Sequence, residues 1–125
     1  MAVNYNATLK SSRMSAVITA IDANASPAMI QIGTAGMAQT LVTITLGDPS
    51  FSESGGVITM TGAPKSGVAA TSGTAAAARI RDGGNVDVVT GLTVGTSGSD
   101  INLNSTSITN GQTVTLSSGT ITHAP

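Results

Sequence analysis

The spacing of apolar residues changes at Pro27, and this change restricts the chain to a helix followed by strands. The apolar residues before it recur at the spacing of one helix face: Met14, Val17, Ile18 and Ile21, with Leu9 about one turn earlier. Asn6 can serve as the N-cap, because its side-chain oxygen accepts an unpaired backbone N–H. Ser26 precedes a proline, which disfavours helical backbone there. The sequence therefore predicts a helix over about residues 7–23.

After Pro27, apolar residues alternate with Thr, Asn, Gln or charged residues, as in half-buried strands. The alternating apolar sets are Ile30 and Ile32; Val42, Ile44 and Leu46; Ile58 and Met60; Ala76, Ala78 and Ile80; Val86 and Val88; Ile101 and Leu103; Val114 and Leu116; and, separately, Ile121 between Thr120 and Thr122. About seven to nine short strands of this kind predict an antiparallel β-sandwich, jelly-roll-like, over about residues 28–123. With the helix against it, the mainly β chain forms a single domain, residues 1–125.

Glycine, proline and asparagine mark the turns between these strands. The expected turns are Gly47-Asp48-Pro49-Ser50, Gly55-Gly56, Asp82-Gly83-Gly84-Asn85, Gly95-Thr96-Ser97-Gly98-Ser99, Asn110-Gly111 and Ser117-Ser118-Gly119. Asn110-Gly111 favours a type I′ hairpin between strands at residues 106–109 and 112–116. The small-residue segment Gly62–Thr74 is either a mobile loop or an edge strand that packs only in a complex.

Few residues could support catalysis. The sole imidazole is His123, near the C-terminal end, where a Ser–His–Asp relay would be poorly held. The chain has no cysteine, so neither a disulfide framework nor a zinc site is expected. The phosphate-loop ending is also absent from the glycine-rich segment 91–98. We expect no enzyme activity, and no catalytic, cofactor-binding or metal-binding residues.

One group of polar residues near the C-terminal end resembles part of a metal-binding motif. Asp100, Asn102 and Asn104 imitate the start of a calcium-binding loop, but Ser105 and Gly111 stand where that loop needs glycine and glutamate. Because Ile101 and Leu103 alternate with them, the three polar residues are expected on the solvent face of a strand.

The carboxylates offer no evident pair for glycosidase chemistry. They are Asp22, Asp48, Glu53, Asp82, Asp87 and Asp100. Asp48 and Asp82 sit in expected turns, and Asp87 and Asp100 sit in outward strand positions. Arg79 and Arg81 point to the same side of one predicted strand. They either form a solvated face or pair with a carboxylate on a partner.

The distribution of charge indicates what kind of surface the protein has. Charged residues make up 9% of the chain and the net charge is −1, against about 25% charged residues in typical soluble domains. This balance argues against direct nucleic-acid binding, and no apolar run approaches a membrane span.

Between Val88 and Pro125, only Asp100 carries a formal charge. Such a surface suits a subunit docked on others, or a carbohydrate-binding domain, although sugar sites usually need more aromatic rings than Tyr5 and Phe51.

Several stretches, in order along nearly the whole chain, resemble one group of viral proteins. They are the segment from Tyr5 to Met14, Ile21-Asp22-Ala23, the segment from Leu46 to Phe51, the segment from Gly95 to Asn104, and the segment from Ser107 to Val114. Together they resemble small proteins encoded among tailed-bacteriophage head genes, of the capsid cement or head decoration type.

The resemblance implies a structural virion protein. It would be made in the bacterial host cytoplasm, bind the outer surface of the capsid as a homo-oligomer, and stabilise contacts between copies of the major capsid protein. No catalytic residue is carried over, because the matching motifs are turns and strands. The alternatives are a tail or fibre subunit of the same virion and a surface glycan-binding β-domain.

Overall fold

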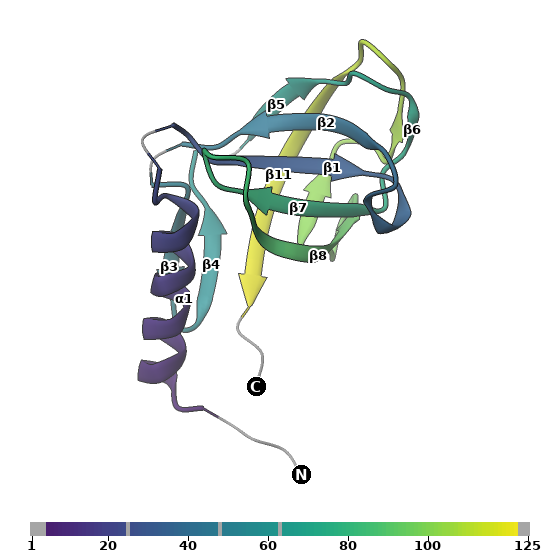
Figure 1. Cartoon of the computed structure of the whole chain (residues 1–125). Coiled ribbons are helices and arrows are strands. Elements are labelled where there is room, and N and C mark those ends of the chain that lie inside the picture. The colour runs from purple at the N-terminus through teal and green to yellow at the C-terminus, as the bar shows by residue number, and fades with distance from the viewer. Residues whose placement is uncertain (1–4, 25, 48, 63, 123–125) are drawn as a thin grey trace.

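The computed structural model describes residues 5–24, 26–47, 49–62 and 64–122 (Figure 1). Its elements, in chain order, are α1 (Ala7–Ile21), β1 (Met29–Gly33), the short 3-10 helix η1 (Ala35–Met37), β2 (Thr40–Thr45), β3 (Phe51–Ser54), β4 (Val57–Met60), β5 (Lys65–Val68), β6 (Gly73–Thr74), β7 (Ala77–Arg81), β8 (Asp87–Gly95), β9 (Ile101–Leu103), β10 (Ser107–Ile108) and β11 (Thr113–Thr122). The prediction of a mainly β protein with an N-terminal helix is confirmed.

Helix α1 begins and ends close to the predicted positions. The Asn6 side chain accepts a hydrogen bond from the Leu9 backbone N–H at 2.8 Å and so caps the helix. Met14 and Ile21 are buried, and the helix packs on β3 and β4 (Figure 1). The predicted extension of the apolar face to Leu9 is wrong, because that side chain is 42% exposed. The buried face thus begins one turn later, at Met14.

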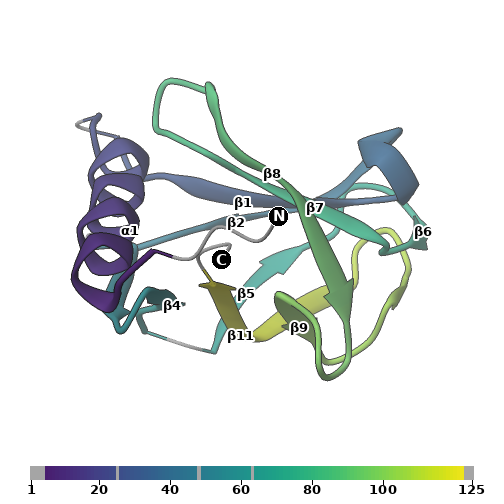
Figure 2. The same ribbon diagram turned by 90° about the horizontal axis from the view of Figure 1, so that it is seen from below.

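Most strands belong to one curled sheet, in the order β2-β1-β7-β8-β9-β11-β4-β3, with β5 also paired to β11. Figure 2 shows β1, β2 and β7 on one side, with β5, β9 and β11 on the other. Strand β8 joins the two sides, since its first part pairs with β7 and its end pairs with β9. The β8–β9 pair is parallel, so the sheet is mixed and the expectation of purely antiparallel pairing is wrong.

The core lies inside this curl and is almost wholly aliphatic. Its largest fully buried side chains are Phe51, Ile21, Ile30, Ile32, Leu41, Ile44, Ile58, Ile80, Ile101, Leu103, Leu116 and Val42. Strand β5 passes so close to β2 that a Cβ atom on Gly67 would lie 2.9 Å from the Thr43 carbonyl oxygen. Glycine at this position therefore lets the two edges of the curled sheet meet.

Two of the predicted inward positions in the alternating sets are wrong. Ala76 is exposed and its neighbour Ala75 is buried instead, because strand β7 begins only at Ala77. Val86 is 59% exposed and precedes β8 rather than belonging to it.

The turns at Gly55-Gly56 and at Asn110-Gly111 have different backbone conformations. Gly55 and Gly56 have φ of +61° and +85° and join β3 to β4, which is the backbone of a type I′ turn. Asn110-Gly111 also forms a turn, closed by the Gln112 N–H donating to the Thr109 carbonyl at 2.9 Å. Only the glycine of that turn has positive φ, as in a type II turn. The predicted type I′ hairpin is wrong, because β10 pairs with β6 and β11 pairs with β4, β5 and β9.

The C-terminal region contains one long strand where two were expected. Strand β11 runs through the predicted turn Ser117-Ser118-Gly119 with an irregularity between Leu116 and Ser118. A Cβ on Gly119 would lie 3.2 Å from the end of the Ile101 side chain, so this glycine fits close packing rather than a turn.

The segment Gly62–Thr74 also differs from both interpretations given above. It contains β5 and β6, which pair with β11 and β10 within the chain, and Ala69 within it is buried. This segment therefore packs without a partner.

Candidate functional site

The most polar cluster in the described part of the chain lies on the outer face of β1, β7 and β8. The Arg81 Nε donates to Asp87 Oδ1 at 2.6 Å, and Arg79 Nη1 lies 3.7 Å from Asp87 Oδ2. The Arg79 Nε also donates to Gln31 Oε1 at 2.8 Å. The two arginines thus share one carboxylate, and Gln31 fixes the plane of one guanidinium group.

Strand alternation explains why these side chains meet. Ala78 and Ile80 of β7 point into the core, so Arg79 and Arg81 must point outward. Arg79 lies opposite Gln31 of β1 in the sheet register, and Arg81 lies opposite Asp87 of β8. The two arginines therefore lie on an outer face, as one of the two interpretations expects, and there they share a carboxylate from their own chain. Pairing with a carboxylate on a partner stays a prediction.

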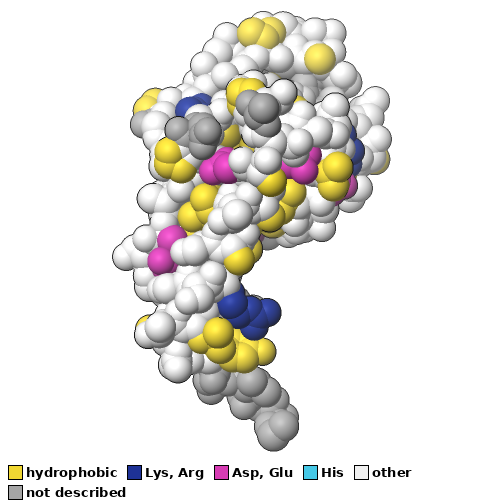
Figure 3. All heavy atoms as spheres, turned by 60° about the vertical axis from the view of Figure 1, so that its left-hand side comes forward, with side chains coloured by type: hydrophobic (Ala, Val, Ile, Leu, Met, Phe, Trp, Pro, Cys, Tyr) yellow, Lys and Arg dark blue, Asp and Glu magenta, His cyan; other side chains and the backbone are white. Residues whose placement is uncertain are grey.

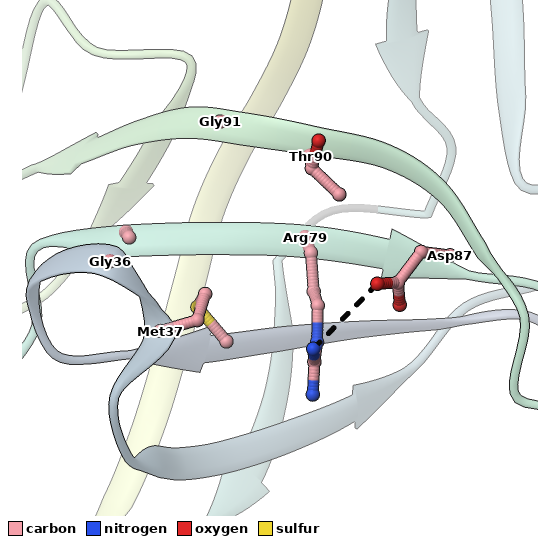
Figure 4. A pocket seen from close by; sticks show the side chains of 7 residues that line it. Gly36, Met37, Arg79, Asp87, Thr90 and Gly91 are labelled. Atoms are coloured by element: carbon pink, nitrogen blue, oxygen red, sulfur yellow. Dashed lines mark ion pairs between the residues drawn. The ribbon is translucent and has the colours of Figure 1, made fainter.

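A pocket of about 280 Å³ opens beside Arg79. Its lining residues are Gly36, Met37, Ala77, Arg79, Asp87, Thr90 and Gly91. Figure 4 shows the Arg79 side chain running along one side, with Met37 from η1 opposite and Thr90 from β8 at the upper rim. The pocket thus combines a charged end, formed by Arg79 and Asp87, with an apolar wall.

Sequence reasoning identified the arginines but missed the pocket. Met37 has φ of +58°, and η1 encloses Gly36 with φ of +67°. The only local sequence sign of this turn is Gly36, and a single glycine does not predict that η1 folds back over β7.

The calcium-like residues accept or donate hydrogen bonds within the chain. Of the three, only Asn102 lies in a strand, β9, and it is half-buried, so the prediction of a solvent-facing strand row holds only in part. Asp100 Oδ2 accepts from the Thr93 N–H at 3.0 Å, and Asn104 Oδ1 accepts from the Thr115 N–H at 3.1 Å. Asn102 accepts from the Ser99 N–H and donates to the Ser118 hydroxyl. These bonds hold the β8–β9 connection and β11 in place.

The remaining carboxylates within the described residues have similar local roles. Asp22 accepts from the Ser50 N–H, Glu53 from the Gly56 N–H, and Asp82 from the Gly84 and Val86 N–H groups. His123 and Asp48 lie outside the described residues. In the part of the chain that is described, no three histidine, cysteine or carboxylate side chains gather in a way that could hold a metal ion.

The surface carries few charged side chains. On the face that Figure 3 shows, lysine, arginine and acidic side chains are scattered among uncharged ones. Exposed positions of β8 to β11 and their loops are mostly Thr, Ser, Asn and Gly. No helix among the described residues is long and apolar enough to cross a membrane.

Comparisons with protein-family models, with curated proteins and with solved structures found no match for this chain.

Proposed function

We propose that this protein is a structural virion component of the capsid cement or decoration type. It would be made in the bacterial host cytoplasm, bind the outside of a tailed-phage capsid as a homo-oligomer, and stabilise contacts between major capsid subunits. The proposal includes a jelly-roll-like sandwich as the docking body, and it assigns the chain no enzyme activity.

The observation that carries the proposal is the nearly uncharged polar surface of the segment that follows Asp87, from Val88 to Thr122. Between Val88 and Pro125 the only formal charge is Asp100, and its carboxylate is engaged by the Thr93 N–H. Hydroxyl and amide groups form hydrogen bonds to another subunit without the larger cost of burying unpaired charges. A surface of this composition suits docking on a repeating protein lattice.

The acidic groups elsewhere in the described part of the chain are hydrogen-bonded or ion-paired within it, which agrees with the same proposal. Asp87 pairs with Arg79 and Arg81, while Asp22 and Glu53 accept backbone hydrogen bonds. Binding would therefore rest on apolar contact and neutral hydrogen bonds. Each contact can be weak, with about 800 Å² buried per partner, because capsid symmetry repeats it and linked contacts reinforce one another.

Gold labelling of intact virions tests this proposal. An antibody against the purified protein is applied to phage particles, with particles from a deletion strain as the control. Labels over heads are expected. Labels confined to tails or fibres would replace the cement role with the tail alternative, and particles without label would contradict a virion role. Binding to a glycan array, without head labelling, would favour the glycan-binding alternative.

A further inference from the structure

We propose that the pocket beside Arg79 binds a single carboxylate group carried on a short apolar stem. This assignment does not depend on the capsid role, because it rests only on the donors, walls and size of the pocket. The carboxylate could belong to a free short-chain acid or to an acidic side chain of a docked protein; the chemistry recognised is the same.

The first support is the incomplete hydrogen bonding of Arg79. Its Nε donates to Gln31, but Nη1 is 3.7 Å from Asp87, beyond hydrogen-bond range. Within the described residues, no protein acceptor receives a hydrogen bond from Nη1 or Nη2 of this arginine. The side chain is only 22% exposed. A partly buried guanidinium group with free terminal donors is well suited to grip an oxyanion.

The second support is the charge balance around that group. Asp87 is bound more closely by Arg81, at 2.6 Å, than by Arg79. One carboxylate facing two guanidinium groups leaves one positive charge uncompensated. A monoanion would bring the net charge of this cluster to zero, whereas a dianion would leave it at about −1.

The third support is the shape and lining of the pocket. Met37 and Ala77 provide apolar surface, and Thr90 adds a hydroxyl group at the rim (Figure 4). Gly36 and Gly91 have no side chain to fill the space, and a Cβ on either would touch nothing within 4 Å. A volume of about 280 Å³ lies below the ~300–1,000 Å³ of drug-sized sites. The pocket therefore suits an occupant smaller than a drug-sized ligand, such as a short-chain acid or one side chain.

Butyrate is a suitable probe, with butyramide as its neutral analogue of the same shape. Each is titrated at constant ionic strength into the full-length, ¹⁵N-labelled chain while backbone amide signals are followed by NMR. Butyrate is expected to shift the signals of Gly36, Met37, Thr90 and Gly91 saturably, with a roughly millimolar dissociation constant. Butyramide is expected to shift them little.

Three variants test whether Arg79 is responsible. Arg79→Gln should weaken butyrate binding about tenfold, because the charged hydrogen bonds are lost. Arg79→Lys keeps the charge but lacks the planar fork, so it should also bind more weakly than the natural chain. Arg13→Gln, at a solvent-exposed position of α1, is the matched control and should bind as the natural chain does. If Arg79→Gln does not fold, the Arg79→Lys result decides.

Equal shifts with butyrate and butyramide, the absence of saturation, or unchanged binding in the folded Arg79 variants would overturn the proposal. A blocked alanyl-glutamyl-alanine tripeptide, compared with its glutamine counterpart, identifies the source of the carboxylate. Tighter binding of the glutamate peptide than of butyrate supports recognition of a protein side chain. Tighter binding of butyrate supports recognition of a free acid.

Discussion

At the scale of single residues, Gly55 and Gly56 provide a matched pair in one turn. Both have positive φ, but a Cβ on Gly56 would lie 2.9 Å from the Lys10 Cβ of α1, whereas a Cβ on Gly55 would touch nothing within 4 Å. Gly55→Ala should lower the free energy of unfolding by about 1 kcal/mol through backbone strain alone. Gly56→Ala should lower the free energy of unfolding by about 1–3 kcal/mol more than Gly55→Ala, because α1 must also shift. Denaturant midpoints of both variants measure this difference, and equal losses would contradict the close contact between the helix and the turn.

Asp22 provides a second test at this scale. Its carboxylate accepts the N–H of Ser50, a buried residue, at 3.0 Å and so ties the end of α1 to the start of β3. Asp22→Ala should lower the free energy of unfolding by about 1–3 kcal/mol, because a buried donor loses its acceptor. Asp22→Asn keeps an acceptor and removes a negative charge from the helix C-terminus. It should therefore lower the free energy of unfolding much less than Asp22→Ala does. Thermal unfolding of the two variants checks the contact; equal effects would show that the hydrogen bond contributes nothing.

The arginine cluster shows what residue-level reasoning could and could not predict. Alternation placed Arg79 and Arg81 on one outer face, as the structure confirms. The carboxylate partner was not predicted, because the expected turn Asp82–Asn85 would place Val86 opposite Arg81. The loop is one residue longer, so Asp87 lies opposite Arg81. The Arg79 pocket likewise depends on η1, whose place above β7 has no local signature.

At the scale of elements, α1 offers a direct comparison of a buried and an exposed apolar residue. Ile21 is fully buried and Leu9 is 42% exposed. Ile21→Ala should lower the free energy of unfolding by about 2–4 kcal/mol through lost burial and a cavity. Leu9→Ala should change it by less than about 0.5 kcal/mol. Chemical denaturation of the two proteins tests this, and a similar loss in both would mean that the helix buries a different face.

Elements specified by local patterns were predicted well, and those specified by distant contacts were not. The helix and the Gly55-Gly56 turn carry their own signals in capping, spacing and glycine. Strand β11 does not, because Ser117-Ser118-Gly119 has turn composition but pairs with β9 and then continues toward β4. Tertiary pairing overrides local turn preference there. For the same reason the Asn110-Gly111 turn forms without a hairpin around it.

At the scale of the whole molecule, the curled mixed sheet arises from strands that change partners. Strand β8 leaves β7 to pair with β9, and β11 pairs successively with β5, β9 and β4. Parallel neighbours normally need a long crossover, so the short connection from Gly95 to Ile101 gives no sign in the sequence of the parallel pair that it joins. Hydrogen bonds between Asp100 and Thr93 hold this connection instead. Periodicity therefore predicted the mainly β class but not the order of strands.

Binding to capsids in a salt series is the most direct test of the proposed cement role. Purified protein is added to heads from a deletion strain, co-sedimentation is measured from low to moderate salt, and DNA release is followed on heating. Salt screens exposed charges over about 10 Å at 0.1 M, but the β8–β11 surface offers almost none. We predict saturable binding that is nearly independent of salt, and DNA release at a higher temperature from decorated heads, because a ligand of the assembled state stabilises it. A steep loss of binding with salt would contradict the uncharged interface, and the absence of binding to heads would contradict the cement role itself.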